Sequence, residues 1–214
     1  MTIDSRRVLV RGVVQGVGFR PFVYRIAHDR DLAGSVRNLG DAGVEIVVEG
    51  PSQAVQSFLA ALRTEPPELS RIDDIDASRS EPTGAAGFVI LPSTQEGSGG
   101  GQLPPDVATC DMCDSEILGA SRFRGYWATS CTDCGPRFTV IESLPYDRPR
   151  TSMSEFPMCA LCYEEYTNPL DRRYHAQTTA CASCGPVLQF DGDATDALSH
   201  ACLLYTSPSP RDRS

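Results

Sequence analysis

The sequence predicts an α+β protein in two parts: a domain with the element order β-α-β-β-α-β, followed by a small domain of two four-cysteine zinc units. Three observations lead to this prediction. Residues 1–92, the N-terminal region, contain no cysteine and alternate between strand-like and helix-like apolar patterns. Residues 93–104 (STQEGSGGGQLP) have the composition of a Gly/Ser linker. Residues 105–190, the cysteine region, contain four Cys-x2-Cys pairs, whereas residues 191–214 resemble neither part.

The N-terminal region is predicted to begin with a buried strand at residues 8–14. A turn rich in glycine follows, and a helix then opens at Pro21, because proline suits a first helical position. Two short strands are predicted at residues 35–38 and 44–49. The Gly-Asp-Ala-Gly stretch between them is typical of a hairpin.

A second helix is predicted over residues 52–63, where apolar side chains recur at helical spacing and Ser52 resembles an N-cap. Strands at residues 71–78 and 88–91 complete the region. The resulting order is the split β-α-β, or ferredoxin-like, arrangement with room for a fifth strand at the sheet edge.

Composition and charge exclude several classes of protein. All 19 basic residues are arginine, so the chain offers no lysine for a P-loop, a Schiff base or pyridoxal phosphate. The net charge of −9 argues against nucleic acid as a partner. No apolar run approaches the roughly 18 residues that a membrane span needs, and no secretory signal is visible. We therefore expect a cytoplasmic protein that binds neither nucleic acid nor membrane.

The segment GVVQGVGFRP, residues 12–21, joins the first strand to the first helix. Gly16 and Gly18 allow positive φ angles, so successive backbone N–H groups can turn toward one anion. Arg20 precedes a proline, which disfavours helical geometry, and its guanidinium is expected at the end of the loop, free for a bidentate contact with phosphate. The alternative is a tight turn with a surface arginine.

This segment, together with GSVRN at residues 34–38 and GVEIVVEG at residues 43–50, resembles the acylphosphatase family over about 90 residues. The resemblance implies that Arg20 holds an acyl phosphate and that Asn38 orients the attacking water. It also implies that the phosphate is bound by the loop of Gln15, Gly16, Val17, Gly18, Phe19 and Arg20. An acyl phosphate is already activated, so its hydrolysis needs neutralised charge and a positioned water and no cofactor. Without the resemblance, Asn38 also fits a turn residue.

The cysteine region is an internal duplication. Residues 110–116 align with residues 159–165, and residues 129–136 align with residues 179–186, at offsets of 49 and 50. Each copy offers four soft ligands, enough for one closed tetrahedral zinc. The copies predict two structural Zn²⁺ sites, one held by Cys110, Cys113, Cys131 and Cys134 and the other by Cys159, Cys162, Cys181 and Cys184. Pairing between copies, disulfides and redox Cys-x2-Cys chemistry are the alternatives.

The combination of an acylphosphatase-like region with duplicated Cys-x2-Cys units ending in Cys-Gly-Pro resembles the N-terminal part of HypF-type carbamoyltransferases of [NiFe]-hydrogenase maturation, over residues 7–188. The resemblance implies carbamoyl phosphate as the substrate. In the whole enzyme it also implies ATP, which forms a carbamoyl adenylate, and a maturation protein whose C-terminal cysteine accepts the carbamoyl group.

The domains that carry adenylate formation and transfer in that family are missing from this sequence, so we expect neither step here. Two hypotheses follow: a module that hydrolyses carbamoyl phosphate, or a non-catalytic capture and zinc scaffold segment. Residues 191–214 are interpreted as the truncated start of a next domain with a disordered or artefactual tail, in which Cys202 has no assigned role.

Overall fold

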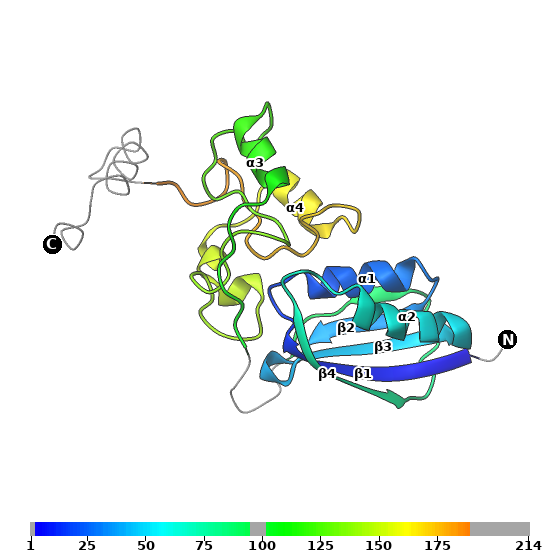
Figure 1. Cartoon of the computed structure of the whole chain (residues 1–214). Coiled ribbons are helices and arrows are strands. Elements are labelled where there is room, and N and C mark those ends of the chain that lie inside the picture. The colour runs from blue at the N-terminus through cyan, green and yellow to red at the C-terminus, as the bar shows by residue number, and fades with distance from the viewer. Residues whose placement is uncertain (1–2, 95–101, 189–214) are drawn as a thin grey trace.

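The computed structural model describes residues 3–94 and 102–188 (Figure 1). The N-terminal region is a five-stranded sheet whose strand order is β4-β1-β3-β2-β5. Its elements are β1 (Ile3–Val13), α1 (Phe19–His28), β2 (Ala33–Asn38), the 3-10 turn η1 (Gly40–Ala42), β3 (Val44–Pro51), α2 (Ser52–Thr64), β4 (Arg71–Arg79) and β5 (Phe88–Ile90). The strand pairs are antiparallel except for β2 with β5, which is parallel. The predicted α+β arrangement, with its fifth strand at the edge, is confirmed.

The core of this region lies between the sheet and its two helices, which cover the same face (Figure 1). Alternate residues of the central strands, such as Val8, Val10 and Ile46, are fully buried. Val55 and Phe58 of α2 close the core from the other side. This alternation follows from the two-residue period of a strand, and it explains why the apolar pattern predicted the elements well.

One predicted helix start and one predicted helix cap were wrong. Helix α1 begins at Phe19 and not at Pro21, so Arg20 lies inside its first turn. Pro21 is tolerated there because the first N–H groups of a helix have no partner within the helix, so the missing donor costs no hydrogen bond. At α2, the N-cap is Pro51, and Ser52 is the first helical residue and makes no side-chain cap. Strand β1 also begins earlier than predicted, at Ile3.

The cysteine region has little regular structure. It contains α3 (Asp111–Leu118), α4 (Ala160–Thr167) and the 3-10 turns η2 (Arg148–Arg150) and η3 (Ser152–Glu155). Cys110 and Cys159 are the N-caps of α3 and α4, so each helix begins at a Cys-x2-Cys pair. Small cores around Phe123 and around the cysteines themselves hold the region together.

The cysteine region packs on the end of the sheet where the β1–α1 connection lies (Figure 1). The ring of Tyr24 on α1 meets the ring of Tyr174 with centroids 5.4 Å apart. The predicted tail at residues 191–214, with Cys202, and residues 95–101 of the predicted linker lie outside the described residues. Among the described helices, none has the length and apolar character needed to span a membrane.

Candidate functional site

The glycine loop, residues 15–20, comprises the end of the connection from β1 to α1 and the first two residues of α1. Gly16 and Gly18 have φ angles of 72° and 71°, in the left-handed region that favours glycine. Gly18 is also the N-cap of α1. Among the described residues, no acceptor is bonded to the backbone N–H groups of Gly16, Val17 or Gly18. The loop therefore keeps several donors for an anion at a helix N-terminus.

Arg20 is buried and not free, contrary to the prediction from the sequence. Its side chain is 9% exposed, and one Nη donates to a carboxylate oxygen of Asp147 at 2.9 Å. The same nitrogen donates to the carbonyl of Tyr146 at 3.2 Å, and the other donates to Oγ of Ser93 at 3.3 Å. The cysteine region thus supplies most of the contacts that fix this guanidinium.

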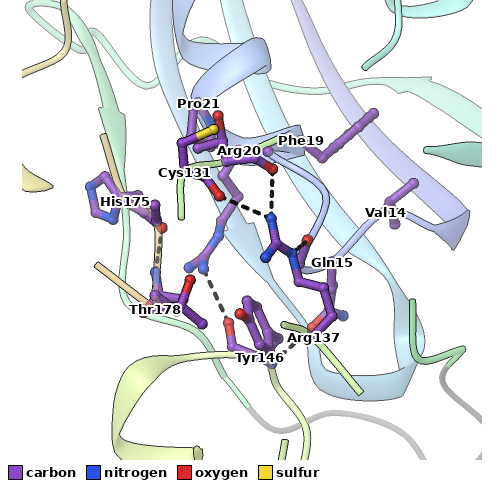
Figure 2. Close-up of a pocket in the computed structure, with 15 residues that line it drawn as sticks. Val14, Gln15, Phe19, Arg20, Pro21, Cys131, Arg137, Tyr146, His175 and Thr178 are labelled. Atoms are coloured by element: carbon purple, nitrogen blue, oxygen red, sulfur yellow. Dashed lines mark hydrogen bonds between the residues drawn. The ribbon is translucent and has the colours of Figure 1, made fainter. Parts of the chain in front are cut away.

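A small cavity of about 20 Å³ lies between the glycine loop and the cysteine region (Figure 2). It has room for about one or two water molecules. The N-terminal region lines it with Val14, Gln15, Gly16, Gly18, Phe19, Arg20 and Pro21, and the cysteine region with Cys131, Thr132, Arg137, Tyr146 and residues 175–178. Five of the six predicted loop residues therefore share one site, whereas Val17 lies in the apolar core.

Hydrogen bonds and ring contacts close this cavity from the cysteine region. The backbone N–H of Tyr146 donates to Oε1 of Gln15 at 3.2 Å. Gln15 in turn donates through Nε2 to the carbonyl of Gly40 in η1. His175 stacks edge-on against Tyr174, and burial, followed by the charge of Arg20, lowers the pKa of His175 to about 4. Its imidazole is therefore neutral at pH 7, and it adds no second cation to the cavity.

Asn38, the other predicted catalytic residue, ends β2 and is 1% exposed. Neither its amide oxygen nor its amide nitrogen has a hydrogen-bond partner in the structure. Its backbone carbonyl accepts from the N–H of Thr94 at 2.9 Å. Asn38 does not line the Arg20 cavity, but Gln15 reaches the η1 turn that follows it. A buried amide without partners is costly, so this side chain is suited to holding a water or a ligand.

The eight paired cysteines form two clusters, and each cluster comes from one copy of the repeat. The first cluster is Cys110, Cys113, Cys131 and Cys134, and the second cluster is Cys159, Cys162, Cys181 and Cys184. Within each cluster all four Sγ atoms lie within 4.8 Å of one another. The shortest Sγ···Sγ distances are 3.5 to 3.8 Å. A tetrahedron with Zn–S bonds of about 2.3 Å has edges of about 3.8 Å, so the donor set fits zinc.

Pairing within each copy, which the duplication favoured, is therefore confirmed, and the eight thiols form no disulfide. The four thiolates of each cluster leave no position for a substrate or an activated water. The arrangement is that of a closed, structural metal site.

Each cluster also receives an arginine from the other copy. Arg172, in the second copy, donates to Sγ of Cys113 at 3.0 Å and pairs with Glu116. Arg122, at the equivalent position of the first copy, donates to Sγ of Cys162 at 3.3 Å and to Glu165 at 3.2 Å. The exchange is reciprocal, so the two copies form one interlocked unit.

Sequence reasoning missed three residues of this site: Arg137 and Tyr146, which line the cavity, and Asp147, which pairs with Arg20. Tyr146 and Asp147 lie between the two copies, outside every repeated motif, and gave no signal. The sequence does carry a signal at Arg137. This residue directly follows the first Cys-Gly-Pro, whereas the second Cys-Gly-Pro is followed by Val187. A difference between two otherwise matching copies indicates a role that only one copy has.

These features define a class: an α+β region with a glycine loop at a helix N-terminus, joined to a region with two four-cysteine clusters. Comparison with known proteins gives the family. The acylphosphatase model matches residues 6–90, and the HypF finger model matches residues 109–141 and 158–190. The chain belongs to the acylphosphatase family and carries a tandem HypF finger.

Individual relatives support both halves of this assignment. The acylphosphatase of Bacillus subtilis is 49% identical over 74 residues, which are 35% of this chain and 80% of that protein. The carbamoyltransferase HypF of Rhodobacter capsulatus is 46% identical over 195 residues, which are 91% of this chain but 26% of that protein. A crystal structure of full-length HypF in the phosphate- and nucleotide-bound form has a TM-score of 0.85 at 39% identity, and covers 94% of this chain and 27% of that chain.

The resemblance to HypF-type carbamoyltransferases is thereby confirmed. The chain spans about a quarter of the length of the HypF relatives that it matches.

Proposed function

We propose that the N-terminal region binds and hydrolyses carbamoyl phosphate, with Arg20 and Asn38 as its catalytic residues. Two sets of unused polar groups carry the proposal: the free N–H groups of the glycine loop that leads into Arg20, and the unpartnered amide of buried Asn38 at the end of β2. An anion and a water would satisfy both. The acylphosphatase relatives support the reaction class.

In the proposed reaction, the loop N–H groups and Arg20 bind the phosphoryl oxygens and neutralise the charge that they gain in the transition state. The Asn38 oxygen accepts a hydrogen bond from a water, which attacks phosphorus as the bond from phosphorus to the acyl oxygen breaks. The products are carbamate and inorganic phosphate, and the proton of the water ends on the phosphate. An amide does not titrate, so it can hold the water over a wide pH range.

We propose zinc for both cysteine clusters, in a structural role. Thiolate pairs of this kind persist in a reducing compartment, which supports a cytoplasmic protein. We further propose that residues 1–92 and 105–190 fold as separate domains joined by residues 93–104. ATP and a maturation protein with a C-terminal cysteine are proposed as partners of the longer HypF-type enzyme, whose remaining length this chain does not span.

The test is phosphate release from carbamoyl phosphate by the full chain, with Arg20→Ala and Asn38→Ala beside it. Arg25→Ala is the matched control, because Arg25 is on the same helix but exposed and away from the cavity. We expect either site substitution to lower kcat/KM by about 100-fold or more, in line with the loss of a transition-state donor, and the control to change it less than two-fold. Equal activity in all four proteins would refute the assignment.

The second candidate is a capture and scaffold segment without turnover. The ion pair of Arg20 with Asp147 and the cavity of about 20 Å³ favour it, because both leave little room for a substrate. Phosphate that protects the glycine loop from hydrogen exchange, without any hydrolysis, would support this candidate over the first.

A further inference from the structure

Arg137 links the first cluster to the glycine loop. It follows the last cysteine of that cluster by three residues, and it is 2% exposed. Its Nε donates to the carbonyl of Gly16 in the glycine loop. The two Nη atoms donate to four carbonyls of the cysteine region, at 2.8 to 3.0 Å: those of Cys131, Thr132, Cys134 and Pro136. One planar guanidinium therefore donates to backbone carbonyls of two cysteines of the first cluster and of the glycine loop at the same time.

The charge of Arg137 has no carboxylate partner within the described residues. The carboxylate of Asp106 bonds to its backbone N–H at 2.7 Å and not to its guanidinium. By contrast, Arg20, Arg172 and Arg173 all form ion pairs. A buried cation that is bonded only to carbonyls keeps its positive potential, and a bound anion would complete its surroundings.

The repeat shows that this arginine is not needed for a cysteine cluster as such. The equivalent residue of the second copy is Val187, which is 67% exposed. The second cluster has the same four-sulfur geometry without an arginine at this position. Arg137 stands only in the copy whose cysteine knuckle touches the glycine loop: Thr132 lies 3.1 Å from where a side chain on Gly18 would begin.

We propose that Arg137 is a positioning residue of the acyl phosphate site and supplies the second positive charge that a phosphate dianion requires there. Its bond to the Gly16 carbonyl fixes the plane of the Gly16–Val17 peptide and hence the direction of the Val17 N–H. Together with Arg20 it provides two cations for two negative charges. Acylphosphatase relatives such as the Bacillus subtilis protein match only 74 residues of this chain, so the cysteine region adds this group to the site. The inference rests on the proposed function.

The test measures binding of inorganic phosphate by calorimetry and hydrogen exchange of residues 16–20 in the full chain. Arg137→Met should raise the dissociation constant for phosphate about ten-fold or more and speed exchange in the loop even without phosphate. Arg137→Lys restores the charge without the fork of donors, so its affinity should lie between those of the wild type and Arg137→Met. If Arg137 only stabilised the fold, the phosphate affinities of the wild type, Arg137→Lys and Arg137→Met would not follow this order when their thermal stabilities are equal.

Arg148→Met is the matched control. Arg148 is a half-buried arginine bonded to three carbonyls, those of Phe156, Gln177 and Thr179, but it does not contact the glycine loop. Its substitution should change phosphate affinity less than two-fold. Wild-type affinity and loop exchange in Arg137→Met would overturn the inference while leaving the proposed function intact. If the wild type binds no phosphate, the proposed function fails, whereas faster loop exchange in Arg137→Met would still support the positioning contact.

Discussion

At Arg20, the cysteine region and a ligand would compete for the same guanidinium. Its ion pair with Asp147 places a carboxylate 2.9 Å from the guanidinium that is proposed to bind phosphate. Asp147 is one-quarter exposed, so the pair is partly screened by solvent. A phosphate bound at Arg20 would face that negative charge at short range.

We therefore predict that Asp147→Asn tightens phosphate binding by about three- to ten-fold, or ~1 kcal/mol, because it removes the charge and keeps the shape. Titration calorimetry with inorganic phosphate measures the change. Asp114→Asn, on α3, is the control for net charge and should leave the affinity unchanged. Weaker binding in Asp147→Asn would mean that the carboxylate orients Arg20 for the ligand and does not compete with it.

At the scale of elements, the reciprocal arginines couple the two copies of the repeat. Arg172 belongs to the second copy but donates to a sulfur of the first cluster. We predict that Arg172→Met weakens metal binding at the first cluster by about ten-fold or more, as expected when a partner of a metal ligand is lost. In a competition with a chromophoric chelator, the metal of the first cluster should leave before the metal of the second cluster. Arg124→Met, at an exposed arginine two residues after Arg122, should release both as the wild type does.

Most of the helices and strands could be predicted from the sequence, but the start of α1 could not. The sheet, both main helices and the four-sulfur sets follow from local patterns, namely apolar periodicity and ligand spacing. The start of α1 does not, because the restriction before Pro21 is only a bias, and the left-handed turn at Gly18 leads directly into the helix. That shift of two residues places Arg20 in the first turn of α1 and not at the end of the loop.

At the scale of the whole molecule, the docking of the cysteine region on the glycine loop could not be predicted. Several of the contacts come from Tyr146 and Asp147, which belong to no apolar period and no ligand motif. The mismatch between Arg137 and Val187 is a signal that the sequence does carry. Contacts between parts that are distant in the chain depend on shape and on buried polar groups, which composition and spacing do not describe.

This docking leads to a prediction for metal removal. The core under the sheet consists entirely of N-terminal residues, from Val8 to Phe88, so it does not need the metal. The first cluster, however, holds the carbonyls that anchor Arg137. A chelator should therefore unfold the cysteine region and speed hydrogen exchange at residues 16–20, while β1 and β3 stay protected. Phosphate affinity should fall at the same time. Simultaneous loss of protection in β1 and β3 would contradict two separate cores, and an unchanged glycine loop would contradict its support by the first cluster.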